Sequence, residues 1–421
     1  MLKSDRSLKA ELLVVGGGIA GITTAIEAAE AGLEVAIVER EACLGGRVAR
    51  FHQYFPKLCP PTCGLEINFR RIRENPSLHV YTLAKVEKIE GHEGNYKVFV
   101  RVKPRFVQPW SQDYSEWAKG CPIELDDPFN YGIGKRKALY RPYESAYPTQ
   151  FVVDERAIEI PEFRDWVKMC PDGGIDLEMK PYTLSIETPS IAWATGWQPY
   201  NANNLDLLSY GKHPDIITNV MMERLAAGNG PTEGKILKLS DNTEPKSVAF
   251  VQCAGSRDEK HLPFCSGVCC LASLKQATYL LEQNPEIEVH IFYIDVRTPG
   301  RLEDFYQARQ EIEKIKLHRG KVAKVEITPQ GLQVIAENTL TGELQKVIVD
   351  LVVLATGMQP STKEEPPPLE IPQDENGFLI QTDDAAGIYG VGTCVRPLDV
   401  AGTLQDATGA AIKALLMARR V

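Results

Sequence analysis

The sequence lacks a basic excess: 47 lysine and arginine residues stand against 56 aspartate and glutamate residues, and the net charge at pH 7 is −9. Proteins that bind nucleic acid normally carry a basic surplus on one face, so this balance argues against such a partner. An uninterrupted apolar run of ~18 residues is also missing, so we expect no membrane-spanning helix. The first residues lack the apolar stretch of a signal peptide, and we therefore expect a cytoplasmic protein.

What the sequence contains is typical of an intracellular globular protein. Its 421 residues are 43% hydrophobic and 24% charged, which suits about two to three domains. Ten cysteines in such a chain indicate metal binding or redox chemistry rather than structural disulfides. Four of them gather in one segment, at Cys253, Cys265, Cys269 and Cys270.

A dinucleotide-binding site is predicted near the amino terminus. The apolar run Ala10–Val15 indicates a buried strand, and the turn Gly16–Gly21 (GGGIAG) follows at once. A helical pattern comes next, and a second strand, Leu33–Val38, ends at Glu39. Strand, glycine turn, helix, strand and acidic residue occur here in the order that a dinucleotide-binding fold requires.

Each glycine of this turn has its own expected role. Gly16 permits the tight turn, Gly18 lets the backbone approach a pyrophosphate, and Gly21 lets the helix pack closely on the strand. The pyrophosphate would lie at the helix N-terminus, where free N–H groups attract anions. Glu39 would accept hydrogen bonds from a ribose hydroxyl. The same stretch supplies three further candidate binding residues, Ile19, Ala20 and Arg40.

Further segments favour FAD as the bound dinucleotide. Gly45–Arg47 follows the acidic residue, as in flavoproteins with two dinucleotide-binding domains. The near-repeat Ala194–Pro199 (ATGWQP) and Ala355–Pro360 (ATGMQP) resembles the strand-to-loop crossing found twice in such proteins. Gly387–Gly392 and the helical pattern after it resemble their closing flavin segment, although Thr393-Cys394 replaces the usual Gly-Asp. The candidate residues from these segments are Gly45, Gly46, Arg47, Thr195, Gly196, Gly392, Thr393, Gly402 and Thr403.

The middle of the chain lacks a nicotinamide site. A strand is predicted at Lys246–Gln252, but no glycine triplet follows it, and another strand is predicted at Ile287–Ile294. This region has the outline of a second nucleotide-binding domain without the turn that holds a pyrophosphate. A plain NAD(P)H dehydrogenase is therefore not expected.

Cysteines stand where that second turn would be. Their spacing is C-x11-C-x3-C-C, with Cys253 at a strand end and Cys265, Cys269 and Cys270 at a loop and helix start. Four thiolates in this arrangement could bind one iron–sulfur cluster. A zinc site and a set of inert, packed thiols are the alternatives that the spacing leaves open.

Six segments of the chain resemble one family. They are ITTAIEAAEAG, LGGR, FPKLCPPTCGLEINFRRI, FNYGIGKRKALYRP, AFVQCAGSRDE and FCSGVCCLASLKQA. Together they are similar to the flavoprotein A subunit of heterodisulfide reductases over nearly the whole chain. The resemblance implies FAD, and it implies that Cys253, Cys265, Cys269 and Cys270 hold a [4Fe–4S] cluster close to the flavin.

An insert predicted at residues 105–176 departs from that family, whose members carry two C-x2-C-x2-C-x3-C-P runs there. Cys121-Pro122 and Cys170-Pro171 match only the last ligand of each run. The other ligand positions hold Ser111, Tyr114, Trp117, Ile160, Phe163 and Trp166. None of these can replace a thiolate, so we expect a degenerate, cluster-free ferredoxin-like insert, either a docking surface or an ordinary surface insertion.

A chain of this length with such an insert, and without a carboxy-terminal ferredoxin extension, most resembles the A subunit of the quinone-interacting membrane-bound oxidoreductase of dissimilatory sulfur metabolism. This resemblance implies an electron-transfer protein that is held at the cytoplasmic side of the membrane through other subunits. Its implied partners are a B subunit with flavin and iron–sulfur groups, a membrane C subunit that handles the quinone, and adenylylsulfate reductase. No residue stands out as a proton-transfer catalyst.

Cys59 and Cys63 allow a rival hypothesis. The resembled family has C-x2-C at this place, whereas the spacing here is C-x3-C. The pair could form a redox-active disulfide in a stand-alone flavin-dependent disulfide or sulfur-compound reductase, contribute to a cluster, or be structural. The GGTC…C arrangement and the carboxy-terminal His-Glu pair of disulfide reductases are missing, and no histidine follows His318. A scaffold subunit whose flavin is structural is a third possibility.

The sequence therefore predicts an α/β flavoprotein with two dinucleotide-binding domains and a thioredoxin reductase-like fold. The FAD-binding domain is expected in three parts, at residues 1–104, 177–200 and 365–421. The degenerate ferredoxin-like insert would occupy residues 105–176. A nucleotide-domain-like middle region with the cysteine cluster would occupy residues 201–364.

Overall fold

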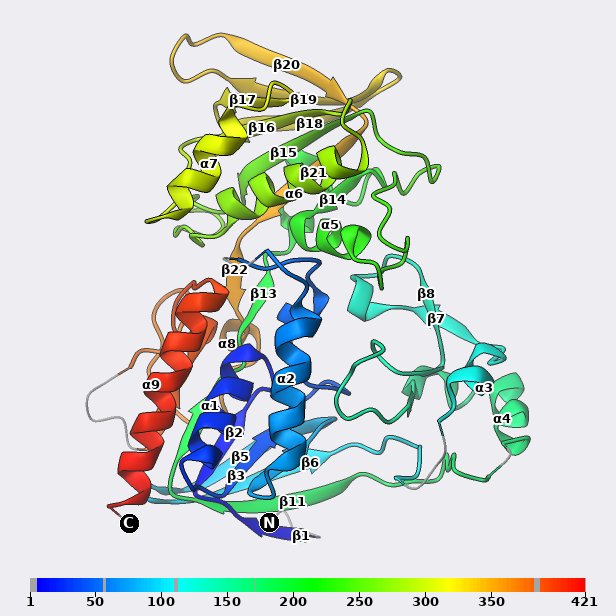
Figure 1. The fold of residues 1–421 in the computed structure, drawn as a ribbon, viewed down its shortest axis with the longest axis vertical. Coiled ribbons are helices and arrows are strands. Elements are labelled where there is room, and N and C mark those ends of the chain that lie inside the picture. Colours follow the sequence, from blue (N-terminus) through cyan, green and yellow to red (C-terminus); the bar gives the residue numbers. More distant parts are fainter. Residues whose placement is uncertain (1–5, 56–57, 110–112, 171, 382–386, 421) are drawn as a thin grey trace.

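In the computed structural model, two units are stacked along the long axis and a lobe projects from one side (Figure 1). We call the lower unit of Figure 1 the first unit, the upper one the second unit, and the lateral one the insert lobe. The structure describes residues 6–55, 58–109, 113–170, 172–381 and 387–420. Over these residues, every helix is too short or too polar to cross a membrane.

The first unit is built on a five-stranded parallel sheet in the order β23-β12-β2-β3-β4. Its strands come from distant parts of the chain: β2 (Leu12–Val15), β3 (Val35–Val38), β4 (Leu78–Tyr81), β12 (Ile191–Trp193) and β23 (Ile388–Gly390). Every residue of β2 and β3 is buried. Their sequences, LLVV and VAIV, are the continuous apolar runs expected of parallel strands that are covered on both faces.

Helices cover one face of this sheet and a second sheet covers the other. Helices α1 (Ile19–Glu30), α2 (Pro61–Glu74) and α9 (Val400–Ala418) stand side by side over the first face (Figure 1). The other face packs on the sheet β1-β11-β6-β5. The strands of that sheet are β1 (Arg6–Lys9), β5 (Ala84–His92), β6 (Asn95–Val102) and β11 (Tyr182–Thr188).

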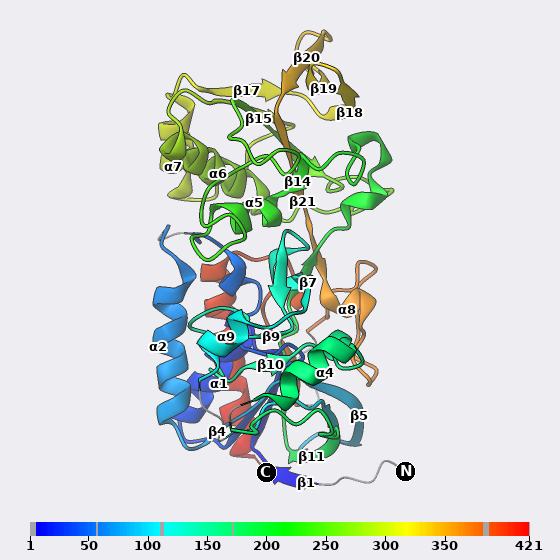
Figure 2. The ribbon, with the colours of Figure 1, turned by 90° about the vertical axis from the view of Figure 1, so that its right-hand side faces the viewer.

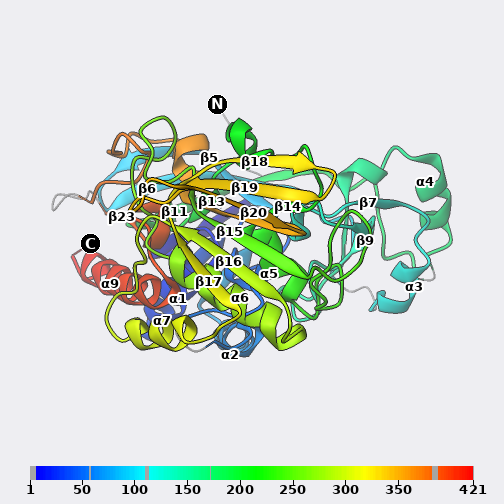
Figure 3. The same ribbon diagram turned by 90° about the horizontal axis from the view of Figure 1, so that it is seen from above.

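The second unit repeats this plan (Figure 3). Its parallel sheet has the order β14-β21-β15-β16-β17, with helices on one face and the antiparallel sheet β18-β19-β20 on the other. The strands are β14 (Ile216–Thr218), β15 (Ser247–Ala254), β16 (Glu288–Tyr293), β17 (Ile315–Arg319), β18 (Val322–Thr328), β19 (Gly331–Glu337), β20 (Leu344–Val349) and β21 (Leu351–Thr356). The helices are α5 (Asn219–Ala226), α6 (Cys269–Gln283) and α7 (Leu302–Gln310).

Two short strands join the units. β13 (Trp197–Pro199) and β22 (Met358–Pro360) are the ends of the two near-repeated ATG segments, and the short helix α8 (Ser361–Glu364) follows β22. The strands pair antiparallel, with Gln198 opposite Gln359. The chain therefore crosses between the units once in each direction, and the two crossings lie side by side (Figure 1).

The insert lobe lies between β6 and β11 and packs around a core of its own (Figure 2). Its elements are α3 (Ser115–Lys119), α4 (Pro161–Lys168), β7 (Glu124–Asp126), β8 (Lys135–Lys137), β9 (Leu139–Tyr140) and β10 (Val152–Val153). Four residues at the degenerate ligand positions pack together there: Tyr114, Trp117, Phe163 and Trp166. The rings of Trp117 and Trp166 stack 3.6 Å apart. These aromatic residues thus pack into a core inside the lobe. The use of the lobe as a docking surface stays a prediction. Ser111 and Pro171 lie outside the described residues.

Candidate functional site

The glycine turn between β2 and α1 has the tight geometry that the sequence predicts. Gly16 has φ +111° and lies against the Ala194 carbonyl, and a Cβ on Gly21 would overlap the Gly16 carbonyl oxygen. Gly18 is the N-cap of α1 and its backbone pairs with that of Gly45. Two glycine turns therefore meet at the N-terminus of α1. Gly45 has φ +113°, and a Cβ on Gly46 would lie 2.8 Å from the Gly18 Cα, so the second turn has no room for a side chain there.

Glu39 follows β3, and its carboxylate binds the backbone of two loops. One oxygen accepts a hydrogen bond from the Gly17 N–H at 2.6 Å and the other from the Glu41 N–H at 2.7 Å. Burial raises the pKa of Glu39, and the two backbone hydrogen bonds act in the opposite direction. The residue predicted to bind a ribose hydroxyl therefore also holds the glycine turn in place.

A cavity of about 440 Å³ opens in front of this turn, and both units line it. Most of the predicted binding residues lie on its wall: Gly16, Gly18, Ile19, Ala20, Glu39, Arg40, Gly46, Arg47, Thr195, Gly196, Thr393 and Thr403. Four predicted residues do not line this cavity: Gly21, Gly45, Gly392 and Gly402. A second cavity of about 330 Å³ adjoins the first at Gly16 and Glu39, and Lys85 and Glu365 line its far side.

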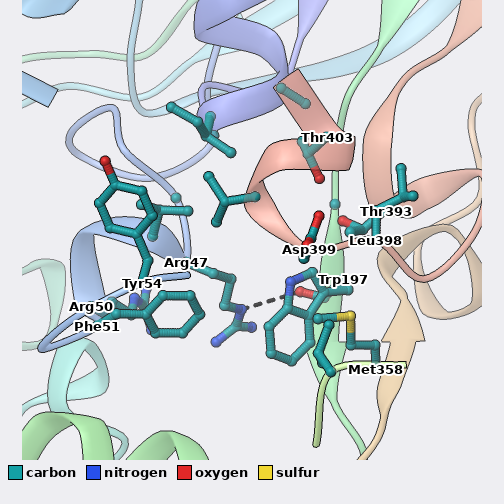
Figure 4. Close-up of a pocket in the computed structure, with 18 of the residues that line it drawn as sticks. Arg47, Arg50, Phe51, Tyr54, Trp197, Met358, Thr393, Leu398, Asp399 and Thr403 are labelled. Atoms are coloured by element: carbon teal, nitrogen blue, oxygen red, sulfur yellow. Dashed lines mark hydrogen bonds between the residues drawn. The ribbon is translucent and has the colours of Figure 1, made fainter. Parts of the chain in front are cut away.

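The α9 side of the large cavity holds an acidic residue that the sequence analysis missed. Asp399 is the N-cap of α9 and lies beside Thr393 and Thr403 (Figure 4). Cys394, which stands where such flavoproteins usually carry an aspartate, is fully buried, and its thiol donates a hydrogen bond to the Trp193 carbonyl at 3.0 Å. Asp399 thus brings a carboxylate to the wall that lacks the usual Gly-Asp pair. An aspartate just before a helical pattern is an N-cap signal that could have revealed it.

Aromatic and basic side chains form the opposite wall (Figure 4). Arg47 reaches across the cavity, where its Nε donates a hydrogen bond to the Trp197 carbonyl at 3.1 Å. Its Nη1 donates to the Tyr131 hydroxyl of the insert lobe, also at 3.1 Å. The sequence analysis did not single out the other residues of this wall: Arg50, Phe51, Tyr54 and Phe55. It also did not single out Trp197 and Met358, which lie on the side of Thr393 (Figure 4). Phe51, Tyr54 and Phe55 lie in a loop, where no helical or strand period marks them.

The second unit adds a buried ion pair to the cavity wall. Glu223 on α5 and Lys275 on α6 lie 2.9 Å apart, and their side chains are 4% and 7% exposed. The Gln276 side chain donates to the Glu223 carboxylate at 2.7 Å. Lys275 also donates to the Gln53 carbonyl of the first unit at 2.5 Å. Such a pair is stable in the interior only because these additional hydrogen bonds satisfy both charges.

Comparisons with known proteins agree with this geometry. Residues 11–54 match the FAD dependent oxidoreductase family. The chain is 36% identical over 371 residues to the A subunit of the ferredoxin:CoB-CoM heterodisulfide reductase of Methanosarcina mazei. This match covers 84% of this chain and 45% of that protein. It is 33% identical over 433 residues to one of the CoB–CoM heterodisulfide reductase iron-sulfur A subunits of Methanopyrus kandleri. This match covers 98% of this chain and 66% of that protein. Its homologues are heterodisulfide reductase A subunits. The chain spans about half to two thirds of the length of these relatives.

Solved structures place the fold among the thioredoxin reductases. The Lactococcus lactis thioredoxin reductase in the FR conformation matches with a TM-score of 0.53 at 15% identity, over 98% of this chain and 100% of that one. An HOCl-induced flavoprotein disulfide reductase from Escherichia coli matches with a TM-score of 0.52 at 14% identity, over 97% of this chain and 71% of that one. The predicted thioredoxin reductase-like fold of an FAD-dependent oxidoreductase is therefore confirmed.

The four cysteines that the heterodisulfide reductase resemblance singles out surround the connection from β15 to α6. Cys253 lies in β15, Cys265 in the connecting loop, and Cys269 and Cys270 begin α6. The residues between them, Ser266–Val268, line the large cavity. Burial raises the pKa of Cys253, and the neighbouring Cys270 and Cys265 raise it further. The thiols thus lie close enough to influence one another.

The described thiols are not arranged as a site for a single metal ion. In the part of the chain that the structure describes, no three His, Cys, Asp or Glu side chains form a group that could hold a metal ion. The Cys269 thiol donates a hydrogen bond to the Thr356 carbonyl and the Cys270 thiol to the Asp295 carbonyl, both at 3.8 Å. Four thiols around one connection have the donor chemistry of an iron–sulfur cluster. The [4Fe–4S] cluster stays a prediction.

Cys59 and Cys63 lie close to the cavity but not on its wall. Cys59 is half-buried, and Cys63 is exposed in the first turn of α2. The Tyr54 N–H donates to the Cys59 carbonyl at 3.3 Å, and the Tyr54 hydroxyl contacts the Cys59 sulfur. Burial, that contact and the nearby Cys63 raise the pKa of Tyr54. Tyr54 itself lines the cavity, so it links the thiol pair to the cavity wall.

Proposed function

We propose that this chain is the FAD-containing electron-transfer subunit of a heterodisulfide reductase-like complex. One observation carries the proposal: the glycine turn at Gly16–Gly21 and the cysteine loop at Ser266–Val268 border the same cavity. A dinucleotide held by the first would lie beside the second. The site residues predicted from the sequence are proposed to bind this cofactor.

The wall of the two cavities suits FAD. The N-terminus of α1 offers N–H groups to a pyrophosphate, and Glu39 lies where the adjoining cavity begins. Thr393, Asp399 and Thr403 offer polar oxygens on the α9 side, and Arg47 and the aromatic residues face them. When bound, FAD supplies an exchange between two-electron and one-electron transfer. The chain binds it, orients it and shields it from water.

We further propose a [4Fe–4S] cluster on Cys253, Cys265, Cys269 and Cys270 as the nearest electron partner of the flavin. Thiolates are the usual ligands of such clusters. The position of these residues on the connection from β15 to α6, where a second nucleotide turn would be, supports an electron path from the cavity into the second unit.

The more specific proposal is that the chain acts as the A subunit of a quinone-interacting complex, in which electrons would pass between membrane quinol and adenylylsulfate reductase. Its partners would be a B subunit with flavin and iron–sulfur groups, together with a membrane C subunit that attaches the chain peripherally to the membrane. The insert lobe supports this proposal, because aromatic residues hold four of the six ligand positions that lack a cysteine and pack together there, as expected of an insert that binds no ferredoxin cluster. The division into an FAD-binding domain at residues 1–104, 177–200 and 365–421, an insert at 105–176 and a middle region at 201–364 is likewise proposed.

Metal and flavin content of anaerobically purified protein tests the central claim. We expect one FAD and about four irons per chain, with an equal amount of acid-labile sulfide and an EPR signal on reduction. Cys269→Ser should lose the iron, whereas Cys121→Ser, a change of an equally buried thiol in the insert lobe, should keep it. FAD without iron or sulfide would contradict the cluster and favour a flavin-only subunit.

A thiol-based reductase is the second candidate function, and the contact between Tyr54 and Cys59 favours it. In that case Cys59 and Cys63 would exchange with a disulfide substrate. Cys59→Ser should then abolish disulfide reduction and leave the iron content unchanged. Loss of electron transfer in Cys269→Ser, with normal activity in Cys59→Ser, would exclude this candidate.

A further inference from the structure

The second unit carries a buried arginine that does not line the cofactor cavity. Arg224, on α5, is 0% exposed, and burial lowers its pKa to about 10. Its hydrogen bonds go to amide and carbonyl oxygens. A charge in the interior is costly unless its hydrogen bonds are satisfied. The hydrogen bonds of Arg224 therefore offset the cost of burying its charge.

The acceptors of Arg224 come from three parts of the molecule. Its Nε donates to the Asn130 side chain of the insert lobe at 2.7 Å. Its Nη1 donates to the Arg50 carbonyl of the first unit at 3.2 Å, and its Nη2 to the carbonyl and side-chain oxygens of Asn229 in the second unit at 3.0 Å. The guanidinium also lies 4.9 Å from the ring centre of Phe129. One side chain therefore joins both units and the insert lobe.

Two neighbours of Arg224 hold the same backbone segment. The Glu223 carboxylate accepts a hydrogen bond from the His52 N–H at 3.0 Å, and the Lys275 ammonium donates to the Gln53 carbonyl at 2.5 Å. Together with the bond to the Arg50 carbonyl, three side chains of the second unit bind the backbone of residues 50–53. This segment is part of the cavity wall, which Arg50 and Phe51 line.

We propose that Arg224 is a positioning residue which, with Glu223 and Lys275, clamps residues 50–53 and the insert lobe to the second unit. The crossing formed by β13 and β22 is a narrow, two-stranded connection about which the units could turn. The clamp removes that freedom and keeps the cavity wall at a fixed separation from the cysteine loop. The existence of the clamp is inferred from these contacts alone. Its role in function rests on the proposed function, in which an electron passes between the cavity and the cysteine loop.

Hydrogen exchange measured by mass spectrometry on the FAD-loaded protein tests the clamp. Arg224→Met should speed exchange about tenfold or more in peptides that cover residues 50–55, because hydrogen bonds to a charged group are lost there. The midpoint potential of the bound flavin should shift as well. Arg136→Met is the matched control: Arg136 also lies over an aromatic ring, that of Tyr140, but its ion-pair partners, Asp127 and Asp154, are all within the insert lobe. It should change exchange in the lobe only.

Unchanged exchange at residues 50–55 in folded Arg224→Met overturns the proposal, and so does an equal effect of Arg136→Met. If Arg224→Met does not fold, Arg224→Lys and Asn130→Ala give the same readout. Arg224→Lys should keep part of the protection at residues 50–55, since it retains the charge without the fork of donors, and wild-type protection in both variants would overturn the clamp. An iron-free wild-type protein would contradict the proposed cluster without changing the exchange result, so the two failures are distinguishable.

Discussion

The two units share one architecture but differ at the turn after their central strand. The sheet orders β23-β12-β2-β3-β4 and β14-β21-β15-β16-β17 correspond strand for strand, and β12 and β21 both run into an ATG segment. In the first unit only residues 16–18 connect strand to helix, whereas residues 255–268 do so in the second. The first connection consists of glycines, whereas the second holds Cys265 and is bordered by Cys253 in β15 and by Cys269 and Cys270 in α6. Since ligand sites of α/β sheets lie at the carboxyl ends of strands, one scaffold can carry a nucleotide site in one copy and a thiol site in the other.

The helices that follow these turns differ in the residue at their third position. The third residue of α1 is Gly21, and the Gly16 carbonyl occupies the space that a side chain would need. The third residue of α6 is Leu271, which is buried and lines the large cavity. Helix α1 therefore packs its third residue directly against the glycine turn, whereas the third residue of α6 carries a side chain that faces the cavity. This contrast is consistent with the proposal that a pyrophosphate binds at the N-terminus of α1.

Gly21→Leu should erase the contrast and gives the largest expected effect. The new side chain would force α1 away from Gly16, so we expect a destabilisation of about 3 kcal/mol and no FAD after gel filtration. Gly409→Leu is the control, because Gly409 lies in α9 where a Cβ would meet nothing within 4 Å. FAD content and urea unfolding check both variants. Full FAD occupancy in Gly21→Leu would contradict the role of this close contact.

Lys275→Met should have the next largest effect, because it leaves the buried Glu223 carboxylate without its partner. We expect a loss of about 3 kcal/mol in the free energy of unfolding. The exposed pair of Lys9 and Glu187 in the first unit, with side chains 88% and 49% exposed, provides the comparison. Lys9→Met should change stability by about 0.5 kcal/mol or less. If Lys275→Met and Lys9→Met lowered the free energy of unfolding by the same amount in urea, the pair of Glu223 and Lys275 would have to be solvated.

Much of the fold near the glycine turn could be predicted because its signals are local. The apolar runs at Leu12–Val15 and Val35–Val38 lie on either side of a helical pattern, so strand, turn, helix and strand follow one another within a few residues. The strands predicted at Lys246–Gln252 and Ile287–Ile294 match β15 (Ser247–Ala254) and β16 (Glu288–Tyr293) for the same reason. Only their ends differ, by one or two residues.

The missed features depend on contacts between residues far apart in the chain. Glu223 and Lys275 meet only because α5 and α6 pack together, and nothing in either segment marks its partner. The pairing of the two ATG segments as β13 and β22 is equally non-local. The aromatic residues of the insert were open to an interpretation as surface because composition does not say which side of a helix faces inward; Phe163 and Trp166 are in fact buried.

Glu39→Gln should weaken FAD binding in the first unit by about tenfold, since a neutral amide loses the charge-assisted hydrogen bonds from Gly17 and Glu41. The acidic residue that follows β16 in the second unit is Asp295, which forms an ion pair with Arg257. Asp295→Asn should leave FAD affinity unchanged. Titration of the apoprotein with FAD, followed by flavin fluorescence, measures both. A similar loss of FAD affinity in the two variants would contradict the assignment of FAD binding to the first unit alone.

The smallest expected effect concerns a pair of histidines in the second unit. His290 on β16 and His318 on β17 have ring nitrogens 2.9 Å apart. Burial, together with the neighbouring His318, lowers the pKa of His290 from 6.5 to about 4. Between these two values the unfolded chain binds a proton that the folded chain does not, so stability should fall as the pH drops through this window.

Urea unfolding near pH 7 and near pH 5 measures this loss. His290→Gln cannot take up the proton, so its stability should fall less than that of the wild type between the two conditions. His79 on β4 of the first unit provides the control, because it lies half-exposed beside Glu34. His79→Gln should keep most of the stability difference that the wild type shows between the two pH values. If His290→Gln and the wild type lost equal stability, the proton would be taken up elsewhere, and the acid sensitivity could not be assigned to the second unit.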